Sequence, residues 1–368
     1  MPEHRKGRTR RAERRTRASR RSSSALALAA ILLGASAGLT TLAAASGSPA
    51  GASTSNGKVP LVLYAAEGYD AAMAKAFQKA TGIPVNLDDD STGPLLTKVQ
   101  AEKNNPKWSL LWVDGDSAFA NLDTEHILLR GWEPKVAWNS QGAAVLPKDR
   151  SYVPTGLTMA GTLVYNSTTV SQPPTSWSQL LQPQWDHQVG MNDPSISGPT
   201  YPFVAGMMSD VGGPKQGEAY FTKLQANGLD VHETNGDTLQ ALEIGQIKLA
   251  IIQSSAGIGA SLKDPNIKVA FLNPVTPIPS VIGIDAKASP EVKAEAKRFV
   301  EFVLSSKGQE VMKTGDPHGD SLFWPVLQGV SPLPALPALS SIPAKPINPY
   351  LWGARESTIN AWFTNNIA

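Results

Sequence analysis

Short apolar runs alternate with amphipathic stretches along the chain beyond residue 58. The run at 61–64 is continuously apolar, which predicts a buried strand. The stretch after it has apolar residues at helical spacing, with Asp70 as the expected N-cap and Gly82 as the expected end. By the same criteria we expect strands at 83–87, 108–113, 188–192 and 249–252, and helices at 94–104, 200–208, 290–304 and 356–363. This order predicts mainly parallel sheets covered on both faces, in an α/β protein long enough for two lobes.

Polar loops that are rich in hydroxyl groups and glycine follow the expected strands. They lie at 65–69, 90–93, 114–116, 195–200 and 253–255. In open α/β sheets, ligands lie beyond the carboxyl ends of the strands. We therefore expect these loops to form a ligand site.

Two of the loops open helices with hydroxyl residues, which favours an anionic ligand group. A helix start presents free N–H groups and the positive end of the helix dipole. Serine and threonine also cap helices that bind nothing, and for one loop alone capping is the simpler interpretation. Two such loops, with a pair of serines at a third strand end, favour an anion site. The side chains expected to hold the anion are Ser91, Thr92, Ser195, Ser197, Thr200, Ser254 and Ser255.

Acidic residues at two neighbouring strand ends suggest a second, positively charged ligand group. Glu67 and Asp114 have side chains that could hold an ammonium group or complete a metal site, whereas Asp116 also fits a solvated loop acid. The acidic run at 88–90 lacks the remaining spacing of an EF-hand calcium loop. The expected ligand contacts are completed by Glu67, Tyr69, Asp114 and Gln253.

The basic charge of the chain is concentrated at its start. Of the 33 basic residues, ten precede residue 22, which leaves 23 basic against 29 acidic residues in the rest of the chain. The body is therefore mildly acidic. This excludes nucleic acid as its expected partner, because phosphate binding needs a basic face.

The first 45 residues have the order of regions found in a secretory signal peptide. A basic stretch ends at Arg21, an apolar run follows at 25–34, and small residues continue to Ala45. We expect cleavage near Ala45, which would leave the protein periplasmic or secreted. The alternative is an uncleaved anchor, and the pair formed by Arg20 and Arg21 leaves both the general and the twin-arginine export routes open. Residues 46–58 have the composition of a flexible linker.

Catalytic and metal-binding signals are weak. The chain has no cysteine, which excludes disulfides, a cysteine nucleophile and thiolate metal sites. Its five histidines show no HExxH or other metal-ligand spacing, and no Walker phosphate loop occurs. We therefore expect neither an enzyme nor a resident metal or cofactor.

Several motifs resemble extracellular solute-binding proteins of ABC importers. The opening strand, loop and helix have the family's pattern, and residues 173–181 resemble its Pro-x-Thr-Ser-Trp-x-x-Leu signature. The resemblance extends from about residue 60 to 330. The remaining motifs that carry it lie at 91–96, 101–102, 161–166 and 302–310.

The resemblance implies a type 2 periplasmic-binding-protein fold, with two lobes that close over a ligand. The implied organisation is lobe I at 59–157, lobe II at 158–276, and completion of lobe I at 277–368. That last part includes a proline-rich segment at 331–349 and a C-terminal helix. The expected crossovers lie near 155–160 and 274–281.

The resemblance also implies a ligand and a partner. Its branch contains ferric-iron, thiamine and 2-aminoethylphosphonate binders, but this chain lacks the adjacent tyrosine pair of the iron proteins. Hydroxyl loops and nearby acids suit a small anionic or zwitterionic solute, with an aminophosphonate favoured. The implied partner is a membrane permease, and the implied protein is a monomer. The alternatives are a ferric-iron or thiamine carrier and a secreted enzyme on a related two-lobed frame.

Overall fold

The structure is a computed structural model and describes residues 58–368; the expected signal peptide and most of the expected linker lie outside these residues. The described chain contains two five-stranded sheets. The first sheet has the spatial order β2 (Val85–Asp89), β1 (Leu61–Ala65), β3 (Leu110–Asp114), β10 (Thr276–Ile284) and β4 (Tyr152–Ala160). The second has the order β7 (Asp230–His232), β6 (Val189–Asn192), β8 (Leu249–Ile252), β5 (Thr162–Asn166) and β9 (Ile267–Ala270). In each sheet four strands run in the same direction and one is antiparallel to them. The antiparallel strand is β10 in the first sheet and β5 in the second.

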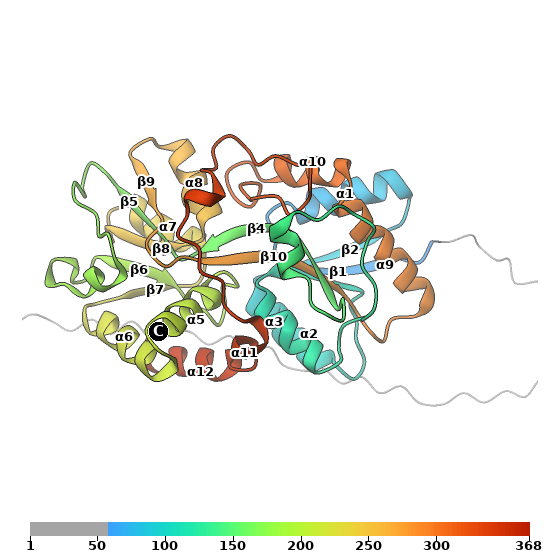
Figure 1. Cartoon of the computed structure of the whole chain (residues 1–368), viewed down its shortest axis with the longest axis horizontal. Helices are drawn as coiled ribbons and strands as arrows, with labels where there is room; N and C mark the ends of the chain where they lie inside the picture. Colours follow the sequence, from blue (N-terminus) through green and yellow to red (C-terminus); the bar gives the residue numbers. More distant parts are fainter. Residues whose placement is uncertain (1–57) are drawn as a thin grey trace, which may run out of the picture. The chain divides into compact units, whose positions relative to one another are not determined.

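Helices cover both faces of each sheet, as predicted for two lobes (Figure 1). In the first lobe these are α1 (Asp70–Thr81), α2 (Thr92–Glu102), α3 (Asp116–Thr124), α4 (Ser140–Val145), α9 (Pro290–Val303) and α10 (Ser306–Gly315). In the second they are α5 (Thr200–Asp210), α6 (Pro214–Ala226), α7 (Asn235–Glu243), α8 (Ser254–Lys263) and the short 3-10 helices η1 (Trp177–Leu181) and η2 (Pro183–Trp185).

The alternation of side chains along the strands places the two cores of the first lobe. Leu63 and Trp112 point to a core shared with α1, α9 and α10, whereas Tyr64 and Val113 point to a core shared with α2 and α3. This is the period of two that a pleated strand imposes. In the second lobe the same alternation separates a core under α5 and α6 from one under α7 and α8.

The first predicted helix is confirmed. Gly82 ends α1 with φ 69°, a conformation that glycine adopts readily, and its N–H donates to the carbonyl of Gln78 at 2.7 Å. Asp70 is the first helical residue, and Tyr69 occupies the N-cap position instead. Strand β2 begins two residues later than expected, after Pro84, which has no N–H for the sheet.

The expected crossovers lie within β4 and β10, which pair with each other along most of their length. β4 leads into β5 of the second lobe, and β10 brings the chain back to the first. The indole N–H of Trp112 is shared between the hydroxyls of Thr155 and Ser280, at 3.0 and 3.1 Å, and so ties the two crossovers to β3.

A C-terminal segment contacts both lobes. The proline-rich segment at 331–349 has little regular structure, with only η3 (Leu339–Ser341), and its Leu336 and Ile342 pack into the first lobe. It is followed by α11 (Pro349–Gly353) and α12 (Glu356–Asn366). The family resemblance implies that the C-terminal helix belongs to the first lobe, whereas Ile359 and Phe363 pack in the core of the second, because the chain crosses back before α12 begins.

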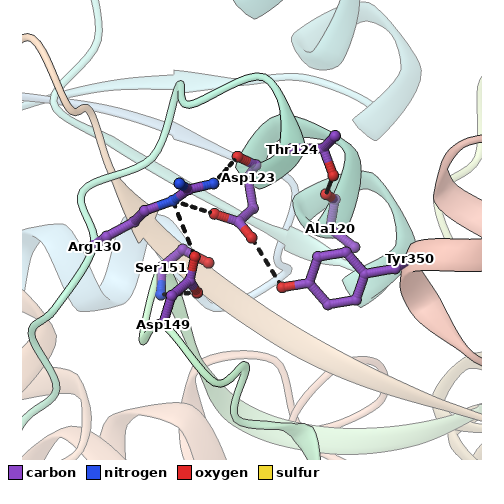
Figure 2. Close-up of polar contacts among 7 residues, drawn as sticks. All are labelled: Ala120, Asp123, Thr124, Arg130, Asp149, Ser151 and Tyr350. Carbon is purple, nitrogen blue, oxygen red and sulfur yellow. Dashed lines mark hydrogen bonds and ion pairs between the residues drawn. The ribbon is translucent and has the colours of Figure 1, made fainter.

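Helix α11 is fixed to both lobes. The hydroxyl of Tyr350 donates to Asp123 of α3 at 2.9 Å, and Asp123 also accepts from Arg130 at 2.7 Å (Figure 2). On the other side, Trp352 packs in the second lobe, and its carbonyl accepts from the hydroxyl of Tyr201 in α5 at 2.5 Å. Among residues 58–368, no helix has the length and apolar character needed to cross a membrane.

Candidate functional site

The start of α2 and the loop before α5 touch across the two lobes. The N–H of Gly93 donates to the carbonyl of Ile196 at 3.0 Å. A Cβ atom on Gly93 would lie 1.9 Å from the carbonyl oxygen of Ser195, and one on Gly198 would lie 2.3 Å from the hydroxyl of Thr92. The lobes are therefore closed on each other here, at a distance that only glycine allows.

A chain of hydrogen-bonded polar side chains also crosses between the lobes. In the second lobe, the amide of Asn192 donates to Asn235 at 2.7 Å, and the amide of Asn235 donates to Gln253 at 3.2 Å. The amide of Gln253 then donates to Asp114 of the first lobe at 2.6 Å and to Thr158 of β4 at 2.9 Å. Asn192, Gln253 and Asp114 are buried. The strand ends thus meet through a continuous polar network.

Two further carboxyl groups lie beside this network. Glu67, which is 3% exposed, accepts a hydrogen bond from the hydroxyl of Ser280. Asp320, in the segment after α10, accepts from the N–H of Gly68 at 2.8 Å and from the hydroxyl of Ser255 at 3.1 Å. Because Ser255 belongs to α8, this last contact is a further polar bond between the lobes, besides those of Gly93 and Gln253.

We call Glu67, Asp114 and Asp320 the carboxylate cluster. Burial raises the pKa of all three groups, to about 8 for Asp114, and each of the other two raises the pKa of Glu67 further. Asp320 likewise raises the pKa of Asp114. No lysine or arginine of residues 58–368 forms an ion pair with the cluster. A buried carboxyl group without a cation holds its proton to a higher pH than an exposed one, and a nearby positive charge favours its release.

The raised pKa of Asp114 predicts a pH dependence of stability. The unfolded chain releases this proton near pH 4, whereas the folded chain holds it to about pH 8, so rising pH favours unfolding across this interval. Asp114→Asn lacks this titrating group, so its stability should not fall with pH for this reason. We therefore expect its melting temperature to rise relative to that of the wild type between about pH 5 and about pH 8, when both proteins are measured without ligand. Differential scanning calorimetry measures this difference, and a value independent of pH would contradict a buried proton on Asp114.

Four of the residues expected from the sequence come together in this region. They are Glu67, Asp114, Gln253 and Ser255. Their proximity follows from the topology, because the carboxyl ends of β1, β3 and β8 face the junction between the lobes.

A second expected group lies at the contact between α2 and the loop before α5. Thr92, Ser197 and Thr200 are buried there, and the oxygen of Ser197 accepts from Asn192 at 3.1 Å. The hydroxyl of Ser195 donates to Asp193 at 2.7 Å. Ser91 precedes α2 but does not cap it with its side chain.

The remaining two expected residues are engaged in the fold. Ser254 is fully buried, and its hydroxyl oxygen accepts from the N–H of Met159 in β4 at 3.0 Å. Tyr69 is 1% exposed and packs on Trp112 at 5.3 Å between ring centroids and on Phe323 at 6.3 Å, and its phenol lies beside Glu67, whose pKa it lowers as a hydrogen-bond partner. Asp116, which also fitted a solvated acid, has a pKa raised to about 7 by burial.

The sequence reasoning missed Asp320, Asn192 and Asn235. Asn192 is the last residue of β6, a strand that the sequence predicts, so the rule that ligands lie beyond the carboxyl ends of strands could have identified it. Asn235 opens α7, which was not expected, and Asp320 lies in an irregular segment with no pattern of its own. Only the fold brings the last two to the junction.

A cavity of about 430 Å³ lies beside the contact between the lobes. Thr92, Gly93, Ser195 and Gly198 line it, as do residues of α3 and α12. It does not include the carboxylate cluster. Within residues 58–368, no three histidine, aspartate or glutamate side chains are arranged to hold a metal ion.

Comparison with known proteins identifies the family. The sequence profile described as "Bacterial extracellular solute-binding protein" matches residues 72–344. A protein of Salmonella paratyphi A, provisionally named a 2-aminoethylphosphonate-binding periplasmic protein, is 23% identical over 240 residues, covering 64% of this chain and 68% of that protein. The Fe(3+)-binding periplasmic protein of Serratia marcescens is 24% identical over 287 residues, covering 72% and 80% of the two chains.

Solved structures share the fold. The periplasmic binding protein P5PA superposes with a TM-score of 0.75 at 18% identity, over 84% of this chain and 100% of that one. This likeness confirms the two-lobed architecture that the sequence motifs implied.

Proposed function

The chain belongs to the bacterial extracellular solute-binding proteins, and on that premise we propose that it captures a small zwitterionic solute for an ABC importer. The carboxylate cluster carries this proposal. The buried Glu67 and Asp114 and the half-buried Asp320, from separate segments, converge where the lobes meet, without a cation to neutralise them. A ligand ammonium group supplies the missing charge.

The other end of the solute is anionic in this proposal. The second lobe presents neutral donors, one amide hydrogen of Asn235 and the hydroxyls of Ser197 and Thr200, and Asn192 holds Ser197 and Asn235 in place with both of its amide hydrogens. Neutral donors and helix starts hold an anion without a full counter-charge. An aminophosphonate such as 2-aminoethylphosphonate combines both ends, which agrees with the provisional name of the Salmonella relative.

Binding and closure are coupled in this mechanism. The open form exposes the cluster to water, and the solute contacts both lobes only when they close. The contacts of Gly93 with Ile196 and of Ser255 with Asp320 form in the closed state and exclude water. The closed protein, exported after cleavage near Ala45 and monomeric, then delivers the solute to a membrane permease.

A ferric-iron carrier is the second candidate, because the Serratia relative is named for iron. The absence of a Tyr-Tyr pair leaves the cluster without the phenolate ligands expected of iron proteins in this branch. A secreted enzyme would differ from both by turning its ligand over.

A thermal-shift screen of residues 46–368 tests the proposal. The ligands are 2-aminoethylphosphonate, ethylphosphonate, thiamine and ferric citrate, and a ligand at 100 times its Kd stabilises the protein by about 2.7 kcal/mol. We expect a large shift with 2-aminoethylphosphonate and a much smaller one with ethylphosphonate, which lacks the ammonium group. A shift with ferric citrate alone would favour the iron carrier, and consumption of a ligand would indicate an enzyme.

The variant Asp114→Asn tests the role of the cluster. It retains an oxygen that can accept from Gln253 but loses the charge, so we expect about 10-fold weaker binding of 2-aminoethylphosphonate. Binding of ethylphosphonate should change by less than about twofold. Isothermal titration calorimetry measures both, and equal losses for the two ligands would contradict an ammonium at Asp114.

A further inference from the structure

The 430 Å³ cavity is enclosed by three parts of the chain. One wall consists of α2 and α3 from the first lobe, with Gln100 and Asn121, and the second consists of the loop around Ser195. The third is α12, which contributes Glu356 and Asn360. A cavity of this volume is within the range of small-molecule sites.

Several hydrogen-bond donors around this cavity are engaged within the protein. The amides of Gln100 and Asn121 both donate to Glu125, each at 3.1 Å. The hydroxyl of Thr97 donates to the carbonyl of Gly93 at 2.9 Å, and that of Ser195 donates to Asp193. The hydroxyls of Thr97 and Ser195 therefore have no hydrogen left for a ligand, whereas the amides of Gln100 and Asn121 keep one hydrogen each.

The acceptors on α12, in contrast, are unused. Glu356 and Asn360 are four residues apart and so lie on one face of the helix, which lines the cavity. The amide oxygen of Asn360 is buried without a hydrogen-bond partner, and Glu356 forms no ion pair within residues 58–368. Burial raises the pKa of Glu356 to about 8. The adjacent Arg355 does not neutralise it, because its guanidinium lies over the ring of Trp352 at 5.2 Å.

We propose that this cavity is a second binding site, separate from the carboxylate cluster, for a small alkylamine bound as its ammonium ion. The ammonium donates to the carboxylate of Glu356 and to the amide oxygen of Asn360. Leu96 and Leu122 contact the alkyl part. An amine held here contacts both lobes and α12, so it also stabilises the closed form.

Calorimetric titration of residues 46–368 with 1,4-diaminobutane tests the site, with 1,4-butanediol as the uncharged analogue. We expect the diamine to bind and the diol not to bind. Glu356→Gln should weaken diamine binding at least about 10-fold, because the charge-assisted hydrogen bond is lost. Glu310→Gln, which changes an exposed acid on α10, should leave diamine binding unaltered.

Two further variants keep the test decisive. Ser357 is exposed and lines the cavity, so Ser357→Lys should exclude the diamine without disturbing the fold. Asp114→Asn should leave diamine binding unchanged, which separates this site from the solute site and makes the result independent of the proposed function. Absence of binding by the wild type, full binding by Glu356→Gln, or loss of binding in Asp114→Asn would each overturn the proposal.

Discussion

Replacing Gly93 with alanine is expected to weaken solute binding by more than about 100-fold while both lobes remain folded. The added Cβ atom would lie 1.9 Å from the carbonyl oxygen of Ser195, which is backbone and cannot move aside as a side chain can. The hydrogen bond from Gly93 to Ile196 would be lost as well. In the proposed mechanism the solute is held by groups from both lobes, so a protein that cannot close retains only half of the contacts.

The same substitution is harmless to α2 itself. Gly93 is the second residue of the helix, where alanine is the better helix former, so the melting temperature should be equal or slightly higher. Gly236→Ala is a matched control, because its Cβ would meet only the hydroxyl of Thr234 at 3.6 Å. Titration calorimetry gives the affinities, and small-angle scattering reports whether ligand still compacts the protein. Wild-type affinity in Gly93→Ala would contradict closure at this contact.

Phe363→Ala is expected to lower the free energy of unfolding by about 3–5 kcal/mol. Phe363 is fully buried in α12 and packs edge-on against Phe221, with ring centroids 5.7 Å apart. Removing the ring leaves a cavity in the core of the second lobe and detaches α12 from it. The loss of stability is large because the Phe363 ring fixes the end of the C-terminal segment, which contacts both lobes.

Denaturant unfolding followed by circular dichroism measures this loss. Asn365→Ala, two residues further on and exposed, should change the free energy of unfolding by less than about 0.5 kcal/mol. Loss of stability in both variants would indicate that α12 is sensitive as a helix, rather than through the buried ring.

The helices and strands that were predicted correctly are those whose apolar pattern and end residues are both clear in the sequence. Strand 249–252 is continuously apolar and was placed correctly, and α9 begins at Pro290, as expected, with Ser289 as its cap. Helix α7 was missed because its apolar positions are few, and its capping box at Thr234 and Asp237 is easily read as loop sequence.

The candidate site was predictable only in part, for a related reason. Glu67 and Asp114 follow strands, so the rule for strand ends places them together. Asp320 reaches them through tertiary packing, in which its carboxylate accepts from Gly68 and Ser255. The role of Ser254 was equally invisible, because its partner is a backbone N–H in β4.

The double attachment of α11 has a consequence for backbone exchange with deuterated water. Opening of the lobes must strain either the bond of Tyr350 to Asp123 or the packing of Trp352 in the second lobe. We therefore expect the amides of Trp352 and Arg355, which donate to the carbonyls of Asn348 and Trp352, to exchange faster when the lobes open. A solute that holds the lobes shut would slow exchange at these amides, so the C-terminal segment reports occupancy without touching the ligand.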